Sequence, residues 1–400
     1  MSIHPLNRRA LVLGMGGSSL AACATTPGAT PAASTPPSPA RPAFVRPPFA
    51  PLQMRTDRIT RITVCTRPFR ATGPRIEVET VGDKRVVHNY GHGGSGWSLS
   101  WGSAAVAAGM ALEGGVRPIA VIGCGAIGLT TALTLKRAGA PVIIYASERL
   151  PHTRSARASG MWTPDSRIAD ADRVDPSFAA LWERMARIAW TEHQTFVGQP
   201  GEPVAFIDRY AVRDSVGPYP SQPRGPEDVR FAEYAGALGN LVPRGHALTP
   251  EESPFVGATV RMGSWMQFNI AELGRRLMSD FLLEGGRIEQ RTFHAPSELA
   301  QLPEPVVVNC TGYGARALFA DDSLIPVRGQ IAWLPPQPEV RYSLYYKGVS
   351  VIVRPDGVGV QGGSGEMDGW RDDTEVADPG EAEKSVDRIA QLYRRSGYNP

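Results

Sequence analysis

Three glycines spaced as Gly-x-Gly-x-x-Gly stand between an apolar run at 119–122 and a helix-like stretch that continues to Arg137. A second apolar run follows at 142–145, so the segment is typical of a βαβ unit that binds a dinucleotide. The glycines of such a unit allow a tight turn, a close approach of the backbone to a pyrophosphate, and close helix packing, and the helix N-terminus faces the phosphates. Glu148 stands at the spacing where an acidic side chain accepts hydrogen bonds from an adenosine ribose. The residues expected at the dinucleotide are Gly123, Cys124, Gly125, Ala126, Ile127, Gly128, Ser147 and Glu148.

A second glycine-rich string lies upstream, at 86–98, and reads Val-Val-His-Asn-Tyr-Gly-His-Gly-Gly-Ser-Gly-Trp-Ser, with Trp101-Gly102 just after it. The string closely resembles the flavin-binding signature of the D-amino-acid and D-aspartate oxidases. Its glycines let the backbone pass close to a flavin ring, and we expect a helix at 103–112 whose N-terminus faces the ring. The βαβ motif does not separate FAD from NAD, whereas this resemblance implies FAD. It assigns to the flavin Gly93, Gly96, Trp97 and Ser98.

Further stretches are similar to the same family, so the resemblance covers most of residues 59–370. Residues 153–164 resemble a loop that clasps the flavin and its diphosphate. Residues 306–312 resemble a later strand of the flavin domain, and Arg328-Gly329-Gln330 follows at the family's usual place. The resemblance assigns to the cofactor Arg154, Ser155, Gly160, Met161, Trp162 and Gly312.

The substrate side is implied by Thr66-Arg67-Pro68-Phe69-Arg70, which resembles the family's Arg-Pro strand. The first arginine of that strand holds the substrate carboxylate, so the resemblance assigns this role to Arg67, whose planar guanidinium can grip a carboxylate with two hydrogen bonds. The carbonyl of Gly94 is expected to accept a hydrogen bond from the substrate amine. Two alternatives stay open: Arg67 forms a structural ion pair, or Arg70 holds the carboxylate instead.

One departure from the family concerns a pair of tyrosines near the substrate. The sequence has Lys347 and Val351 at the corresponding places, although Tyr342, Tyr345 and Tyr346 lie just upstream. We expect Tyr346 to cover the pocket if the loop is shifted. Without such a residue the site is more open, or its substrate is larger or less like a neutral D-amino acid.

The order of the motifs is unusual. In the family the Arg-Pro strand and the glycine-rich string close the chain, whereas here they precede the βαβ unit and are joined to it through Glu113-Gly114-Gly115. The sequence therefore predicts a circular permutation, with new ends at Met54 and Pro400. The termini of a domain often lie close together, so joining them by a short loop costs little conformational entropy. We then expect residues 393–400 to lie close to Ile59 in space.

The N-terminal residues are typical of an exported lipoprotein. Arg8 and Arg9 precede a short apolar region, and Leu20-Ala21-Ala22-Cys23 resembles a lipobox, so we expect twin-arginine export and a lipid anchor at Cys23, with a plain cleavable signal as the alternative. The region is too short to span a membrane. A proline-rich linker follows to about residue 53. The remaining cysteines, Cys65, Cys124 and Cys310, do not have the spacing of a disulfide framework.

Composition points to small-molecule chemistry. The 42 basic and 39 acidic residues give a net charge of +3 without a basic run, which argues against nucleic acid as a partner. His88 and His92 lack companions at metal-ligand spacing, so no metal is expected and both histidines are interpreted as fixing their loop. A chain of 400 residues with 42% hydrophobic content can bury one large core or two modest ones.

These observations predict an α/β protein with a Rossmann-like FAD-binding domain and a second, α+β substrate domain containing an antiparallel sheet. We expect a signal at 1–23, a linker at 24–53, an FAD domain from 54–170 plus 295–325, a substrate domain from 171–294 plus 326–375, and a helical segment, 376–400, that returns to the FAD domain. The resemblance implies oxidation of a D-amino acid by hydride transfer to flavin N5, giving a 2-oxo acid, ammonia and hydrogen peroxide. The alternatives are oxidation of glycine, sarcosine or another amine, an acceptor other than oxygen such as a quinone, and a non-catalytic envelope flavoprotein.

Overall fold

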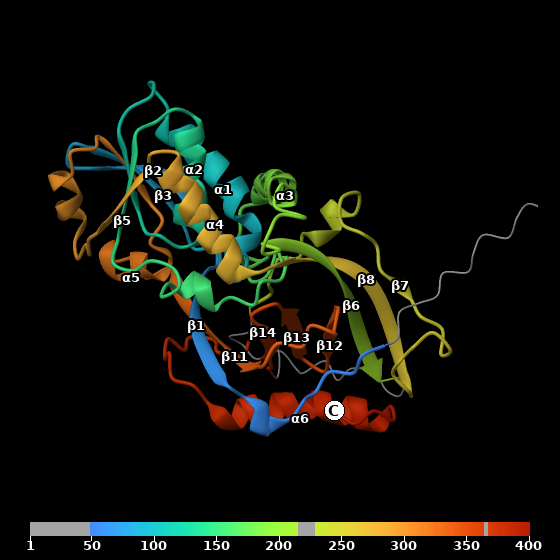
Figure 1. Ribbon diagram of the computed structural model, residues 1–400. Helices are drawn as coiled ribbons and strands as arrows, with labels where there is room; N and C mark the ends of the chain where they lie inside the picture. Colours follow the sequence, from blue (N-terminus) through green and yellow to red (C-terminus); the bar gives the residue numbers. More distant parts are fainter. Residues whose placement is uncertain (1–48, 215–228, 364–366) are drawn as a thin grey trace, which may run out of the picture. The chain divides into compact units, whose positions relative to one another are not determined.

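A computed structural model describes residues 49–214, 229–363 and 367–400, which belong to one unit, Phe49–Pro400, built around two β-sheets (Figure 1). The predicted signal and most of the linker lie outside the described residues. The fold begins slightly before the expected Met54, because Phe49 stacks on Tyr342 and Leu52 is fully buried. No helix in the described ranges is long and apolar enough to cross a bilayer.

The first sheet has the strand order β2-β3-β10-β4-β5-β9, and its strands are parallel except for the edge strand β2. Strand β10 pairs with β3 on one side and β4 on the other, although it follows both far along the chain. This parallel arrangement confirms the predicted Rossmann-like sheet. The strands are β2 Arg75–Val81, β3 Lys84–Tyr90, β4 Ile119–Ile122, β5 Val142–Ala146, β9 Arg287–Gln290 and β10 Val306–Asn309.

Alternate residues of this sheet pack into two apolar clusters, one on each face. Val121 and Val308 belong to the larger cluster, while Ile122 and Val307 belong to the smaller one. The alternation follows from the two-residue repeat of a strand, so the buried runs are apolar on both faces. Helices α1, α2 and α4 contribute to the larger cluster, and α3 packs on α1. Their bounds are α1 Gly96–Ala111, α2 Ala126–Arg137, α3 Phe178–Gln194 and α4 Ile270–Leu283, with the short α5 Ala315–Leu318 against the smaller cluster.

The second sheet has the order β1-β11-β14-β13-β12-β6-β8-β7, and it is antiparallel except where β12 runs parallel to β6. Helix α6, Pro379–Arg395, packs along β11, β13 and β14. In Figure 1 this helix lies beneath the sheet. The strands are β1 Arg61–Arg70, β6 Val204–Asp214, β7 His246–Ala247, β8 Ala258–Phe268, β11 Leu324–Leu334, β12 Tyr342–Tyr346, β13 Val349–Arg354 and β14 Gly357–Gln361.

Several element positions differ from the predicted domain boundaries. Strand β1 belongs to the second sheet rather than the FAD domain, whereas β9 and α4 belong with the first sheet rather than the substrate domain. Helix α6 packs on the second sheet and does not return to the FAD domain. Strand pairing and helix packing decide these memberships, and neither is visible in the periodicity of a single segment.

Helix α1 begins at Gly96, seven residues before the predicted Ser103. Gly96 and Gly102 are part of the helix, whereas Gly91, Gly93 and Gly94 precede it. A Cβ at Gly102 would collide with the backbone of Met185 in α3, so this glycine permits close packing of two helices rather than a turn.

The two ends of the described chain meet as expected. Ile59 packs against the apolar cluster that contains Tyr393, and the Phe49 ring stands 5.3 Å from the ring of Tyr398.

Candidate active site

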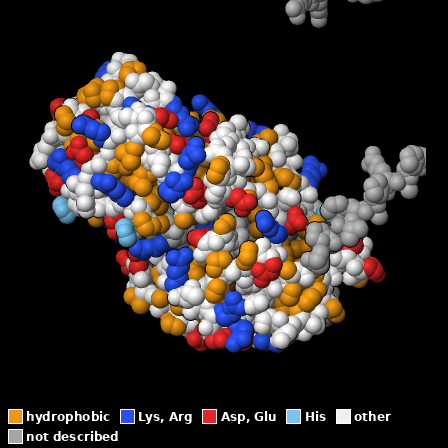
Figure 2. All heavy atoms as spheres, viewed as in Figure 1, with side chains coloured by type: hydrophobic (Ala, Val, Ile, Leu, Met, Phe, Trp, Pro, Cys, Tyr) orange, Lys and Arg blue, Asp and Glu red, His pale blue; other side chains and the backbone are white. Residues whose placement is uncertain are grey.

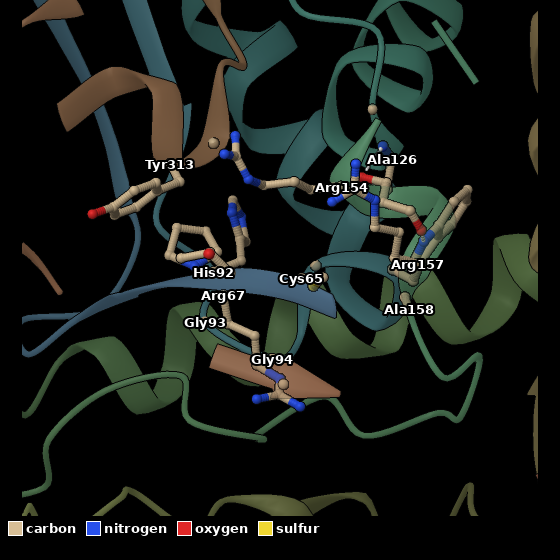
Figure 3. Close-up of a pocket in the computed structure, with 18 of the residues that line it drawn as sticks. Cys65, Arg67, His92, Gly93, Gly94, Ala126, Arg154, Arg157, Ala158 and Tyr313 are labelled. Atoms are coloured by element: carbon tan, nitrogen blue, oxygen red, sulfur yellow. Dashed lines mark hydrogen bonds between the residues drawn. The ribbon is translucent and has the colours of Figure 1, made fainter. Parts of the chain in front are cut away.

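A cavity of about 1070 Å³ is lined by residues of both sheets (Figure 3). Its lining includes the turn between β4 and α2, the loop between β3 and α1, and the ends of β5 and β10. Further parts of the described wall come from the segment 153–163, from strands β1, β11, β6 and β12, from residues 361–363 and 368–372, and from helix α6. The carboxyl ends of parallel strands are where open α/β sheets bind ligands.

The turn between β4 and α2 has the geometry that its glycines predict. Gly123 has φ +109°, and a Cβ there would stand 2.6 Å from the carbonyl oxygen of Cys310. Gly128 does not line the cavity, because it faces the Gly123 carbonyl and lets the helix pack against the turn. At the α2 N-terminus the Ala126 N–H donates to the Ser155 hydroxyl at 3.0 Å. This helix end therefore opens into the cavity beside Ser155, with its positive pole available to an anion.

The loop between β3 and α1 is held against the segment that precedes α3. A Cβ at Gly93 would collide with the Arg167 carbonyl, and the Gly94 N–H donates to the Ser166 carbonyl at 2.9 Å. The backbone at both glycines lines the cavity. Close approach of two backbones requires glycine here, so the loop presents main chain to the cavity.

His88 and His92 both hold neighbouring elements, although His88 lies within β3 and only His92 lies in the loop that follows it. His88 is hydrogen-bonded to Glu79 at 2.9 Å, and His92 to Ser103 at 2.7 Å. Burial lowers the pKa of His92 to about 3, so its imidazole is neutral at physiological pH. In the described part of the chain no group of three possible metal ligands is found.

The first turn of α1 is tied to the segment 153–163. The Trp97 indole N–H donates to the Ser155 carbonyl at 2.8 Å, and the Thr163 N–H donates to the Ser98 hydroxyl at 2.8 Å. These bonds join the two loops that the sequence assigned to the flavin.

Most predicted cofactor residues line the cavity. Trp162 is an exception, because its ring is buried against Trp190, 5.2 Å away. Ser147 and Glu148 lie at an exposed part of the lining, at the end of β5. Of the predicted cofactor residues, the cavity is lined by Gly93, Gly96, Trp97, Ser98, Gly123, Cys124, Gly125, Ala126, Ile127, Ser147, Glu148, Arg154, Ser155, Gly160, Met161 and Gly312.

Arg67 lines the cavity, and Arg70 does not. Arg70 donates to the Ser323 hydroxyl and the Gly73 carbonyl and lies 3.6 Å from Asp321, so it has a structural role. The Arg67 guanidinium donates to the Arg328 carbonyl at 3.0 Å. Burial lowers its pKa from the ordinary arginine value, so the cation lies in a partly desolvated wall. A carboxylate that reached it would be bound strongly.

Tyr346 was expected at the pocket, but the structure places it elsewhere. Its ring belongs to the cluster beneath the second sheet, and its hydroxyl donates to Asp214 at 3.1 Å. Tyr345 lines the cavity instead. Successive side chains of a strand point to opposite faces, so a shift of β12 by one residue would exchange Tyr345 and Tyr346 between the cavity and the opposite face. Lys347 pairs with Asp214, and Val351 is fully buried.

Three further lining residues, Arg157, Tyr313 and Arg209, were not individually predicted from the sequence. Arg157 and Arg154 both pair with Glu375. The guanidinium carbon of Arg154 lies 5.8 Å from the ring centre of Tyr313. Arg209 reaches the cavity from β6. Arg157 lies within the predicted loop 153–164 and Tyr313 directly follows Gly312, whereas Arg209 is brought to the cavity by the pairing of β6 with β12 and β8.

The residues present fit a flavin dinucleotide. The hydroxyl oxygens of Thr66 and Thr153 are buried on the cavity wall without a hydrogen-bond partner. Buried hydroxyls in native structures are normally satisfied, so these two indicate polar groups of a ligand. Ser155 and Arg154 would hold the diphosphate at the α2 N-terminus, and Glu148 stands where a ribose is expected.

The face shown in Figure 2 carries interspersed basic and acidic side chains rather than a basic field.

Comparisons with known proteins identify the family. The chain is 28% identical over 293 residues to a D-amino-acid oxidase of Streptomyces coelicolor, covering 68% of this chain and 77% of that protein. It is 29% identical over 278 residues to a D-amino-acid oxidase of Rubrobacter xylanophilus, covering 69% of this chain and 77% of that protein. A similar solved structure is iminodiacetate oxidase from Chelativorans sp. BNC1, with 13% identity, a TM-score of 0.46, and coverage of 70% of this chain and 79% of that one. The family model described as FAD dependent oxidoreductase (DAO) matches residues 118–396. With this match across most of the described fold, the chain belongs to the DAO family of FAD-dependent oxidoreductases.

Proposed function

We propose that the chain catalyses oxidative deamination of a D-amino acid. At the family level it is an FAD-dependent amino-acid oxidoreductase. The observation that supports the finer assignment is the placement of Arg67 on the cavity wall that also carries the flavin loop. The relatives named D-amino-acid oxidase support the D configuration.

The chain's own residues bind and orient the substrate. Arg67 binds the α-carboxylate, and the Gly94 carbonyl accepts a hydrogen bond from the amine, which fixes the direction of the Cα–H bond. The chemistry that FAD supplies when bound is acceptance of a hydride at N5. No strong base is required of the protein, because the substrate loses hydride and the rate depends on its placement. The imine is then hydrolysed to a 2-oxo acid and ammonia.

The test is a visible spectrum of the purified holoprotein under anaerobic conditions. We expect a flavin band that bleaches with D-amino acids and not with their L-isomers, and hydrogen peroxide on admission of oxygen. Arg67→Met should lower kcat/KM for every α-amino acid by about 100-fold or more, because a charged hydrogen-bonded pair is lost. The matched control is Arg70→Met, which removes an arginine of the same strand that does not line the cavity.

Bleaching only by sarcosine, glycine or another N-substituted amine would replace the D-amino-acid assignment with that of an amine oxidase. Because Tyr346 does not line the cavity, D-amino acids and N-substituted amines must be compared as substrates. Bleaching without peroxide formation would point to a different acceptor such as a quinone. Failure of every amine to reduce the flavin would favour the non-catalytic envelope flavoprotein.

We also propose that the chain is a circular permutant of its family. The family match begins at residue 118, yet β1 and β3 from the unmatched segment pair with β11 and β10 from the matched one. Moving residues 54–115 behind Pro400 through a short flexible joint should give a protein that still folds and binds FAD. Loss of flavin binding in that rearranged protein, with the starting protein intact, would contradict the proposal.

We further propose export to the cell envelope with a lipid anchor at Cys23, supported by the sequence Leu20-Ala21-Ala22-Cys23. Metabolic labelling with a palmitate analogue should mark the wild type and not Cys23→Ala. Replacing both arginines of the predicted export signal, Arg8→Lys with Arg9→Lys, should retain the protein in the cytoplasm. Labelling that survived the Cys23 substitution would rule out this anchor.

A further inference from the structure

A second guanidinium reaches the cavity from the antiparallel sheet. Arg209 lies in β6 and lines the same cavity as Arg67. Its guanidinium carbon stands 4.5 Å from the ring centre of Trp265 on β8 and 5.7 Å from that of Tyr345 on β12. Two aromatic rings on the neighbouring strands therefore hold this side chain in place.

Several arginines of the wall, unlike Arg209, have a carboxylate partner among the described residues. Arg154 and Arg157 pair with Glu375, and Arg328 lies 3.3 Å from Glu381. For Arg209 no ion pair is found among residues 49–214, 229–363 and 367–400, and its buried Nε has no hydrogen-bond partner there. Burial lowers its pKa, with only Tyr345 acting in the opposite direction.

The Arg209 side chain is partly buried and its Nε is fully buried, and a buried cation without a compensating charge is costly. A ligand group of opposite charge would therefore bind favourably here. The diphosphate of FAD does not account for this charge, because its expected place is the α2 N-terminus on the parallel sheet, beside Ser155. Arg209 and its two aromatic neighbours belong to the other sheet, which also carries Arg67. A substrate group bound against this sheet would be placed to supply the opposite charge.

We propose that Arg209 binds an anionic group at the end of the substrate's side chain, so that the preferred substrate is an amino acid with a second carboxylate. This inference rests on the proposed function, in which Arg67 binds the α-carboxylate. Two guanidinium groups in one cavity would then grip the two ends of a dicarboxylic substrate, and the flavin loop would face its α-carbon.

The sharpest test compares acids with their nearly isosteric amides. The ratio of kcat/KM for D-aspartate over D-asparagine, and for D-glutamate over D-glutamine, measures only the contribution of the distal charge. We expect an acid-over-amide ratio of about 10 to 100 in the wild type, the range of a charge-assisted hydrogen bond. In Arg209→Met the ratio should fall to about one or below. Arg209→Lys should restore part of it, since the charge is kept and the planar fork is lost.

The matched control is Arg213→Met, which removes an exposed arginine of the same strand that does not line the cavity. It should keep the wild-type ratio. The FAD content of each purified variant reports whether it is folded. A lower acid-over-amide ratio in an Arg209→Met protein with full FAD content is therefore an effect on specificity. Equal ratios in Arg209→Met and the wild type would overturn the proposal.

A binding measurement separates this proposal from the proposed function. Succinate and succinamate differ in one charge, and their affinities can be read from the perturbed flavin absorption without turnover. Tighter binding of succinate by about 10-fold or more, lost in Arg209→Met, supports the assignment of Arg209 even if no D-amino acid reduces the flavin. Equal affinities for the two ligands, in a protein that oxidises neutral D-amino acids, would overturn the assignment of Arg209 and leave the proposed function standing.

Discussion

The guanidinium of Arg67 occupies the space in which a side chain at Gly329 would stand. Gly329 lies on β11, the strand that pairs with β1, and the preceding carbonyl of Arg328 accepts the Arg67 hydrogen bond at 3.0 Å. The absence of a side chain at Gly329 thus leaves room for the cation that would seat the substrate.

Gly329→Ala should displace Arg67 without removing its charge. We expect kcat/KM for amino acids to fall about 10- to 100-fold, because a displacement of about 1 Å in a positioning group is enough for such a loss. Steady-state kinetics and titration with a carboxylate inhibitor measure the effect. Gly109→Ala is the control, since a Cβ at that helical glycine has open space and should be neutral or stabilising.

Tyr345 and Tyr346 should respond differently to substitution. Tyr345→Leu removes a ring from the cavity wall, and we expect a change of several-fold in KM. Tyr346→Phe removes the hydrogen bond to Asp214 and should cost about 1 kcal/mol of unfolding free energy without changing KM. Urea denaturation and steady-state kinetics on both variants decide between these roles, and a kinetic defect confined to Tyr346→Phe would contradict the register of β12.

Asp214 should make stability depend on pH in acid solution. Burial acts to raise its pKa, but hydrogen bonds from Lys347, Arg395 and Tyr346 outweigh it and lower the pKa to about 2. A lowered carboxyl pKa stabilises the fold above the unfolded value of about 3.9, and this contribution disappears as pH falls toward 2. Asp214→Asn should therefore be less stable than the wild type by about 1 kcal/mol at neutral pH. Unfolding curves recorded between pH 7 and pH 2 should show the difference shrinking.

Two buried histidines should weaken the fold at mildly acid pH. Burial lowers the pKa of His92 to about 3 and that of His193 to about 4, below the ordinary value of about 6.5. The unfolded chain therefore takes up protons that the native state excludes, and stability falls as pH drops below 6.5. Each histidine contributes up to about 1.4 kcal/mol per pH unit. A His193→Gln variant should show a shallower fall between pH 6.5 and pH 4.5 than the wild type, and an unchanged slope would exclude this origin.

The cofactor side of the site was predictable because its residues are adjacent in the sequence. Gly123 and Gly125 act through the local backbone of a single turn, and such a turn has the same geometry wherever the surrounding strand and helix form. Arg67 was assigned through resemblance, and the structure places it on the cavity wall, whereas the alternative, Arg70, lies beside Asp321 and does not line the cavity.

The substrate side was less predictable because it depends on register and on pairing between distant strands. The sequence favoured Tyr346 over Tyr345, yet the placement of β12 between β6 and β13 directs Tyr345 to the cavity. Arg209 comes from a strand without a motif. Helix α1 was predicted too short because Gly102, which allows close contact with α3, was interpreted as part of a loop.

Strand β10 is the middle of the parallel sheet and the last of its strands to leave the ribosome. A nascent chain that ends before residue 306 has both glycine-rich loops but lacks the strand that pairs with both β3 and β4. Stable flavin retention would then depend on synthesis of the chain beyond residue 309. Truncated chains released before that point should be colourless and exposed to proteolysis at the open edges of the sheet.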